Sequence, residues 1–182
     1  GVQNLLVPTL ADPKARAAFE RTLPSFIRRQ RWFGAKDCSI LDVRIADAVR
    51  IVRDPWPVYL SILDVTLTPA DGPERQDTYL LPLTVRPEDA DGEDGGQTLL
   101  LERPHAALTW LDLPDTRVLL YDAAVGPDFW LALFRWWTSG TKGRSLRGTY
   151  VGDAAEWVRR HPPKVARPLA GEQSNSAAIL DG

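Results

Sequence analysis

The spacing of the apolar residues changes from a helical period to an extended one at about residue 39, and this change constrains the fold most. Asp12 and Pro13 suit the N-cap and the first position of a helix, and Pro24 predicts a kink or a restart within it. Apolar side chains recur on one face of this helix at Ala15, Ala18, Phe19, Leu23, Phe26 and Ile27. A single helix ahead of strands indicates an α+β fold, with the helix covering one face of a sheet.

Four later segments have the pattern of antiparallel strands: residues 40–52, 59–67, 78–85 and 98–103. Between the second and third, residues 69–73 predict a turn in which Gly72 supplies a positive φ. Pro82 cannot donate a ladder hydrogen bond, so it predicts an edge or a bulge in the third strand. The acidic, glycine-containing residues 86–97 predict a solvated loop.

The second half of the chain has a mixed pattern. Residues 127–138 predict a helix with apolar side chains, including Trp130, Trp136 and Trp137, on nearly every face. Such a helix is expected to lie buried between two layers. A short helix is expected at residues 153–160, ended by the two prolines that follow it.

Composition excludes several classes of protein. The formal net charge of −2 and the pI near 5.7 argue against nucleic-acid binding, and no apolar run approaches the roughly 20 residues that span a bilayer. The start lacks the basic stretch of a signal peptide. Cys38 is the single cysteine, so no internal disulfide is expected and the cytoplasm is the default location. Cys38 and the two histidines do not make a plausible set of zinc ligands.

Two groups of residues have both a functional and a structural interpretation. Trp32 and Phe33 could stack on a sugar, but we favour core packing as the helix ends, with Gly34 in a left-handed terminating conformation. The arginines of this region could bind an anionic partner, but a solvated helix face is commoner; they are Arg21, Arg28, Arg29 and Arg31. His105 and His161 lie beside prolines with no evident partner, and we assign them no role.

The segment Gly171-Glu172-Gln173-Ser174-Asn175-Ser176 is a candidate phosphate-binding loop. Backbone N–H groups beside small polar side chains form anion pockets. The alternative is an ordinary turn that opens a hairpin to residues 177–180. Because the segment has neither a Walker nor a GxGxxG pattern, the residues alone favour the turn.

Five segments in register resemble one known family. They are Arg29-Gln30-Arg31-Trp32-Phe33-Gly34-Ala35-Lys36-Asp37, Tyr79-Leu80-Leu81-Pro82-Leu83, Leu120-Tyr121-Asp122-Ala123, Leu146-Arg147-Gly148-Thr149 and the segment from Gly171 to Ser176. In this order they resemble the amino-terminal part of bacterial maltokinases, including the form fused behind trehalose synthase.

The resemblance implies an ATP-dependent kinase that converts maltose to maltose 1-phosphate for α-glucan (glycogen) synthesis. Such kinases are similar to the aminoglycoside phosphotransferase and protein-kinase group. They carry a cystatin-like cap, a helix packed on an antiparallel sheet, over the nucleotide lobe. The implied division is a cap at residues 1–103, an intermediate mixed region at 104–170, and the start of a kinase nucleotide-binding lobe at 171–182.

In the family, the segment that corresponds to Gln173, Ser174, Asn175 and Ser176 opens the lobe that holds the ATP phosphates. The phosphate-binding lysine, the catalytic aspartate and the metal ligands follow it. We therefore assign no catalytic residue and no metal ligand, and we expect residues 1–182 alone to be inactive. ATP and magnesium are expected in the whole enzyme and not in this fragment.

The implied partners are the rest of the kinase and a fused or associated trehalose synthase. Two alternatives stay open: a kinase of another sugar, such as glucosamine, and a non-catalytic module that binds a protein or a glycan.

Overall fold

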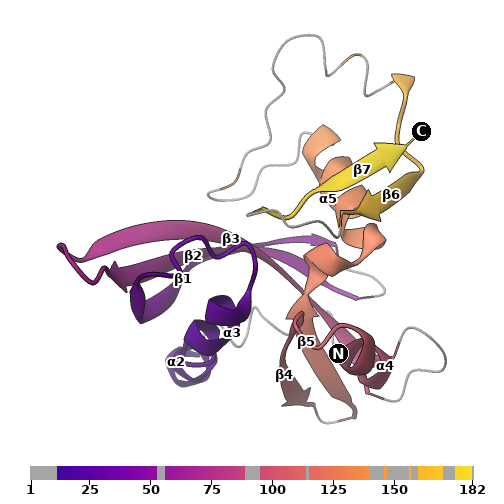
Figure 1. Ribbon diagram of the computed structural model, residues 1–182. Coiled ribbons are helices and arrows are strands. Elements are labelled where there is room, and N and C mark those ends of the chain that lie inside the picture. Colours follow the sequence, from indigo (N-terminus) through magenta and orange to yellow (C-terminus); the bar gives the residue numbers. More distant parts are fainter. Residues whose placement is uncertain are drawn as a thin grey trace.

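The structure is a computed structural model with an α+β fold, as predicted: helices pack on a five-stranded antiparallel sheet (Figure 1). It describes residues 12–52, 56–88, 95–113, 115–139, 146, 156, 160–169 and 175–181. None of the helices in these ranges has the length and apolar content that crossing a membrane requires.

Two short helices, α2 (Pro13–Glu20) and α3 (Leu23–Arg29), stand where one was expected to kink or restart. The Asp12 carboxylate caps α2 by accepting a 3.0 Å hydrogen bond from the backbone N–H of Lys14. Pro24 lies in the first turn of α3, where its missing N–H leaves no broken bond. The predicted restart is therefore confirmed.

The sheet contains β1 (Ser39–Val52), β2 (Val58–Thr68), β3 (Arg75–Pro87), β4 (Ala107–Asp112) and β5 (Arg117–Asp122), in the order β1-β2-β3-β5-β4. Gly72, in the turn between β2 and β3, has a φ of +149° as predicted. Pro82 lies one residue before β3 begins to pair with β5 at Leu83. That stretch of β3 is thus an edge, which is what its proline predicted.

The predicted strand at residues 98–103 is wrong, because α4 (Gly96–Glu102) occupies this position. Its three leucines, Leu99 to Leu101, are good helix formers, so the apolar run alone did not distinguish helix from strand. Gly96 permits the close approach of the helix start to the sheet. A Cβ there would lie 3.0 Å from the backbone oxygen of Pro87 and 2.9 Å from the ring of Trp110.

The main core lies between α3 and the sheet. Leu23, Phe26 and Ile27 of α3 are buried together with Phe33 and the inward side chains of the strands. A partly buried ion pair ties α2 to β1, with 2.9 Å between Arg16 Nε and Glu20 Oε1. The same carboxylate oxygen accepts a 2.9 Å hydrogen bond from the backbone N–H of Ile45, so the pair fixes α2 on the sheet.

The second half contains the short helix η3 (Ala123–Val125), α5 (Pro127–Thr138) and a hairpin of β6 (Val165–Pro168) and β7 (Ala178–Asp181). The bounds of α5 match the prediction, and it packs beside β6 and β7 (Figure 1). Its expected burial between two layers is wrong, because Phe129 is its only buried residue in the described chain. Trp137 is 41% exposed, and Trp130 and Trp136 are partly buried against a second, smaller cluster.

Two further expectations concern single features. Gly34 is not left-handed, because Gly72 is the one described glycine with a positive φ. Helix α3 ends instead at Arg29, where Gln30 turns to an extended conformation. Most of the helix expected at residues 153–160 lies outside the described residues; Glu156 and Arg160 are helical and form an ion pair.

The sheet contains strands on both sides of residue 103, and the division at residues 103 and 170 stays a prediction.

Candidate functional site

The predicted phosphate loop lies in the connection between β6 and β7. Gln173 and Ser174 lie outside the described residues, whereas Asn175 and Ser176 are described and exposed just before β7. The backbone N–H of Leu169 donates a 2.9 Å hydrogen bond to the carbonyl of Ala177. This bond extends the hairpin beyond its strands, so Asn175 and Ser176 lie next to an ordered ladder.

Asn175 and Ser176 line two neighbouring cavities in the cap, and both cavities share the side chains of Trp32, Asp122 and Ala124. The end of the predicted loop therefore lies against residues that are more than 50 positions earlier in the sequence.

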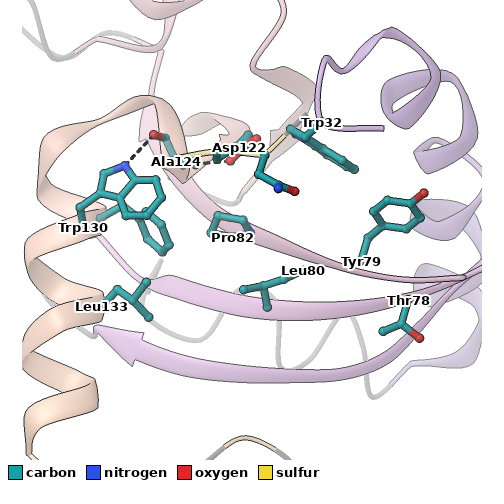
Figure 2. A pocket seen from close by; sticks show the side chains of 12 residues that line it. Trp32, Thr78, Tyr79, Leu80, Pro82, Asp122, Ala124, Trp130 and Leu133 are labelled. Atoms are coloured by element: carbon teal, nitrogen blue, oxygen red, sulfur yellow. Dashed lines mark hydrogen bonds between the residues drawn. The ribbon is translucent and has the colours of Figure 1, made fainter. Parts of the chain in front are cut away.

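The first cavity, which we call the aromatic cavity, has a volume of about 430 Å³. Figure 2 shows Trp32 and Tyr79 on one side of it, Trp130 and Leu133 of α5 on the other, and Pro82 between them. The indole N–H of Trp130 donates a 2.9 Å hydrogen bond to the carbonyl of Ala124, drawn dashed in Figure 2. This bond fixes the α5 wall to the end of the sheet.

The second cavity, which we call the arginine cavity, has a volume of about 660 Å³. Its cap wall carries Arg29, Arg31, Arg103 and His105. His105, which was assigned no role from the sequence, has a pKa lowered by partial burial and then by the charges of Arg31 and Arg103.

Asp122, the last residue of β5, is the carboxylate common to both cavities and is only 4% exposed. Its Oδ1 accepts a 2.9 Å hydrogen bond from the backbone N–H of Ala124, and the side chain of Trp32 also hydrogen-bonds to it. Burial raises the pKa of Asp122 from 3.8 to about 6, although both hydrogen bonds lower it. Desolvation of the charged form is therefore the dominant influence on this group.

Sequence reasoning did not single out Asp122 as a site residue. The available signal was a polar residue that ends an apolar run, since Val118 to Tyr121 are all buried. Its side chain caps η3 through the bond to Ala124, and an aspartate ahead of a helical turn commonly does this. The pairing with Trp32 had no local signal, because 90 positions separate the two residues.

Trp32 and Phe33 differ in their environments. Phe33 is fully buried, which agrees with the core interpretation, whereas Trp32 is partly buried and lines both cavities. The rings of Trp32 and Phe33 lie 5.7 Å and 5.6 Å from that of Tyr79. Trp32 therefore connects the core to the candidate site.

The arginines are not simply a solvated face, because several bind backbone carbonyls. Arg28 Nη1 donates to the carbonyl of Cys38 at 2.6 Å, and Arg29 Nη2 donates to that of Ala107 at 2.6 Å. The buried Gln30 donates to the carbonyl of His105 at 2.9 Å. The bonds of Arg29 and Gln30 fix the end of α3 to the start of β4 and to the segment before it, and the bond of Arg28 fixes α3 to the residue before β1. Nothing in the local pattern predicted them.

The described ranges contain no group of three His, Cys, Asp or Glu side chains arranged to hold a metal ion. The site therefore consists of cationic, aromatic and amide groups around one buried carboxylate.

Comparison with known proteins gave one result that bears on this site. The maltokinase N-terminal cap domain family matches residues 26–125, which are 100 of the 182 residues. The match begins in α3, contains the whole sheet and ends just beyond Asp122. A comparison with curated proteins gave no match. The chain belongs to the maltokinase N-terminal cap domain family and thus to a larger maltokinase with a kinase portion.

Proposed function

We propose that this chain is the cap and connecting region of an ATP-dependent kinase that phosphorylates maltose to maltose 1-phosphate. The family match supports the kinase assignment. The observation that carries the proposal is the contact region at Asp122 and Trp32, where Asn175 and Ser176 line the same cavities as the cap. In this proposal the cap supports the loop that receives the nucleotide phosphates, and the kinase portion carries the chemistry.

The described end of the loop fits a phosphate group. Asn175 offers an amide and Ser176 a hydroxyl, both exposed, and backbone N–H groups in such turns bind anions. ATP, when bound, supplies the phosphoryl group that is transferred. A magnesium ion needs several oxygen ligands, and Asp122 is the one carboxylate among the described residues of the two cavities. Metal ligands are therefore expected from the kinase portion.

The support that the cap gives rests on rigid elements. The Ala124 backbone is held from two directions, by Asp122 Oδ1 at its N–H and by the Trp130 indole at its carbonyl. Catalysis of phosphoryl transfer depends mainly on positioning and charge. A fixed wall behind the loop would restrict its conformations and reduce the cost of ordering it around the nucleotide.

The test uses the full-length kinase that contains this sequence. ATP consumption is measured with maltose, with glucosamine and with no sugar. We expect turnover to depend on maltose, and Asn175→Ala to raise the KM for ATP several-fold. Arg75→Gln is the matched control, because Arg75 pairs with Asp77 on the exposed end of β3 and lines neither cavity.

ATP consumption that no sugar stimulates would refute the kinase proposal, and a response to glucosamine alone would reassign the sugar. A trehalose synthase partner is tested separately, by co-purification with the same full-length protein. Recovery of the kinase alone would refute that part of the proposal.

A further inference from the structure

The arginine cavity concentrates positive charge on a chain whose formal net charge is −2. Arg29, Arg31 and Arg103 line one cavity together. Among its described lining residues the one acid is Asp122, which is buried and bonded to Ala124 and Trp32. The three guanidinium charges are therefore not neutralised by ion pairs within the cavity.

Two of these guanidinium groups are held in place without losing their charge. Arg29 donates to the carbonyl of Ala107 and lies 5.1 Å from the centre of the Phe26 ring. Arg103 donates to the carbonyl of Val125 through Nη1. A guanidinium has five N–H donors, so each of them keeps donors for a ligand.

Arg31 is the most available cation of the three. It is exposed, and the described part of the chain provides it with no hydrogen bond and no ion pair. Its charge reaches into the cavity nevertheless, because Arg31 and Arg103 both lower the pKa of His105. Both charges therefore act on the part of the cavity that His105 lines, and partial burial of the imidazole lowers its pKa further.

The opposite wall of the cavity is formed by the β6–β7 connection. Asn175 and Ser176 are exposed there and line the cavity together with Pro168 and Leu169. Amide and hydroxyl groups donate hydrogen bonds to anionic oxygens, and arginine matches the geometry of a phosphate group. A hollow of about 660 Å³ is within the range of small-molecule sites, so its volume suits a compact anion.

We propose that the arginine cavity binds a phosphorylated small molecule, with its phosphate group held by Arg31 and Arg103 of the cap and by Asn175 and Ser176 of the hairpin. Sugar phosphates and nucleotides share this phosphate chemistry and both fit the volume. The site combines the cap wall with Asn175 and Ser176, so the inference rests on the proposed function, in which these two residues receive a phosphate group.

The test measures binding to the 182-residue chain by titration calorimetry at low ionic strength. The probes are glucose 1-phosphate, ATP and tripolyphosphate, with maltose as the uncharged control. We expect Arg31→Gln and Arg103→Gln each to weaken binding by roughly ten-fold or more, as the loss of one charge-assisted contact implies. Arg75→Gln, which removes the same charge outside the cavity, should leave binding unchanged. Higher salt should weaken all binding.

Thermal unfolding of each variant verifies that the chain still folds. Tighter binding of glucose 1-phosphate than of tripolyphosphate assigns the site to a sugar phosphate, and preference for ATP assigns it to a nucleotide. No binding of any phosphate probe, or equal binding by folded Arg31→Gln and Arg103→Gln variants, would overturn the inference. Binding of polyglutamate as tight as that of tripolyphosphate would also overturn the inference, because it would show that the cavity does not distinguish phosphate from carboxylate groups. None of these outcomes depends on sugar-dependent turnover, so a failure of this inference can be distinguished from a failure of the kinase proposal.

Discussion

The two apolar clusters of this chain differ in how completely they are covered. In the cluster between α3 and the sheet, Leu23, Ile27, Phe33, Leu63 and Leu67 have no exposed surface. Around α5, by contrast, large apolar residues remain accessible: Trp137 is 41% exposed, and Ile179 and Leu180 of β7 are 43% and 36% exposed. The first cluster is a closed core, and the second is a half-covered layer.

This difference indicates that the region that stabilises the fold and the region that contains the candidate loop lie in different parts of the chain. Closed cores open only by global unfolding, whereas regions with few buried contacts open at lower free energy. The loop residues Asn175 and Ser176 belong to the second kind of region. They face Asp122, which is buried, and Trp32, which packs against the closed core.

The largest expected effect is in the closed core. Phe33→Ala should lower the free energy of unfolding by about 3–5 kcal/mol, because a buried aromatic side chain is lost and a cavity is left. Phe33 is fully buried and contacts the Tyr79 ring. Urea unfolding followed by tryptophan fluorescence measures the change. A loss below about 1 kcal/mol would contradict the description of this cluster as close-packed.

An intermediate effect is expected at the boundary between the clusters, at Asp122. Its pKa is higher in the folded chain, about 6 against 3.8, so the folded state binds the proton more tightly. The stability contributed by Asp122 therefore falls as pH rises through this window, by roughly 3 kcal/mol if each pKa unit is worth about 1.4 kcal/mol.

The measurement compares urea unfolding of the wild-type chain and Asp122→Asn between pH 4 and pH 7. The difference in stability, wild type minus variant, should decrease as pH rises, because asparagine does not titrate. Because both proteins contain the same other acidic side chains, the contributions of those side chains to the pH dependence cancel in the difference. A difference that is constant with pH would show that Asp122 is not desolvated.

The smallest effect is expected on the half-covered layer. Trp137→Gln should lower the free energy of unfolding by only about 1 kcal/mol, the typical cost of a single substitution, because the Trp137 side chain is 41% exposed. The same urea titration measures it, with Phe33→Ala as the comparison. A loss that approaches the Phe33→Ala value would show that the α5 layer is as tightly packed as the core, and the contrast would fail.

Local signals accounted for much of the fold. Prolines and a glycine marked the break between α2 and α3, the turn at Gly72 and the start of α5, because these residues restrict the backbone wherever they occur. The wrong secondary-structure predictions concern apolar runs whose residues follow neither helical nor strand spacing. Residues 98–103 became helical, and β4 was not expected, since its burial depends on pairing with β5.

The candidate site was only partly predictable. Asn175 and Ser176 were named from the family motif, and their position against the cap adds to that prediction without testing nucleotide binding. Asp122 was missed as a site residue, and Arg29 was named without its bond to the carbonyl of Ala107, because the partners of both side chains are distant in sequence. The spacing of residues in the sequence does not reveal tertiary hydrogen bonds of this kind, whereas capping and turn residues can be recognised from the local sequence.

The bonds from α3 to the segment before β4 also have a consequence for the order of folding. Gln30 and Arg29 bind carbonyls that are 75 and 78 positions later in the chain. During synthesis, which proceeds from the N-terminus, α3 leaves the ribosome first, yet these bonds must wait until residue 107 has emerged. The helix that covers the core is therefore expected to dock late, after the β1–β2–β3 hairpins, whose contacts are more local.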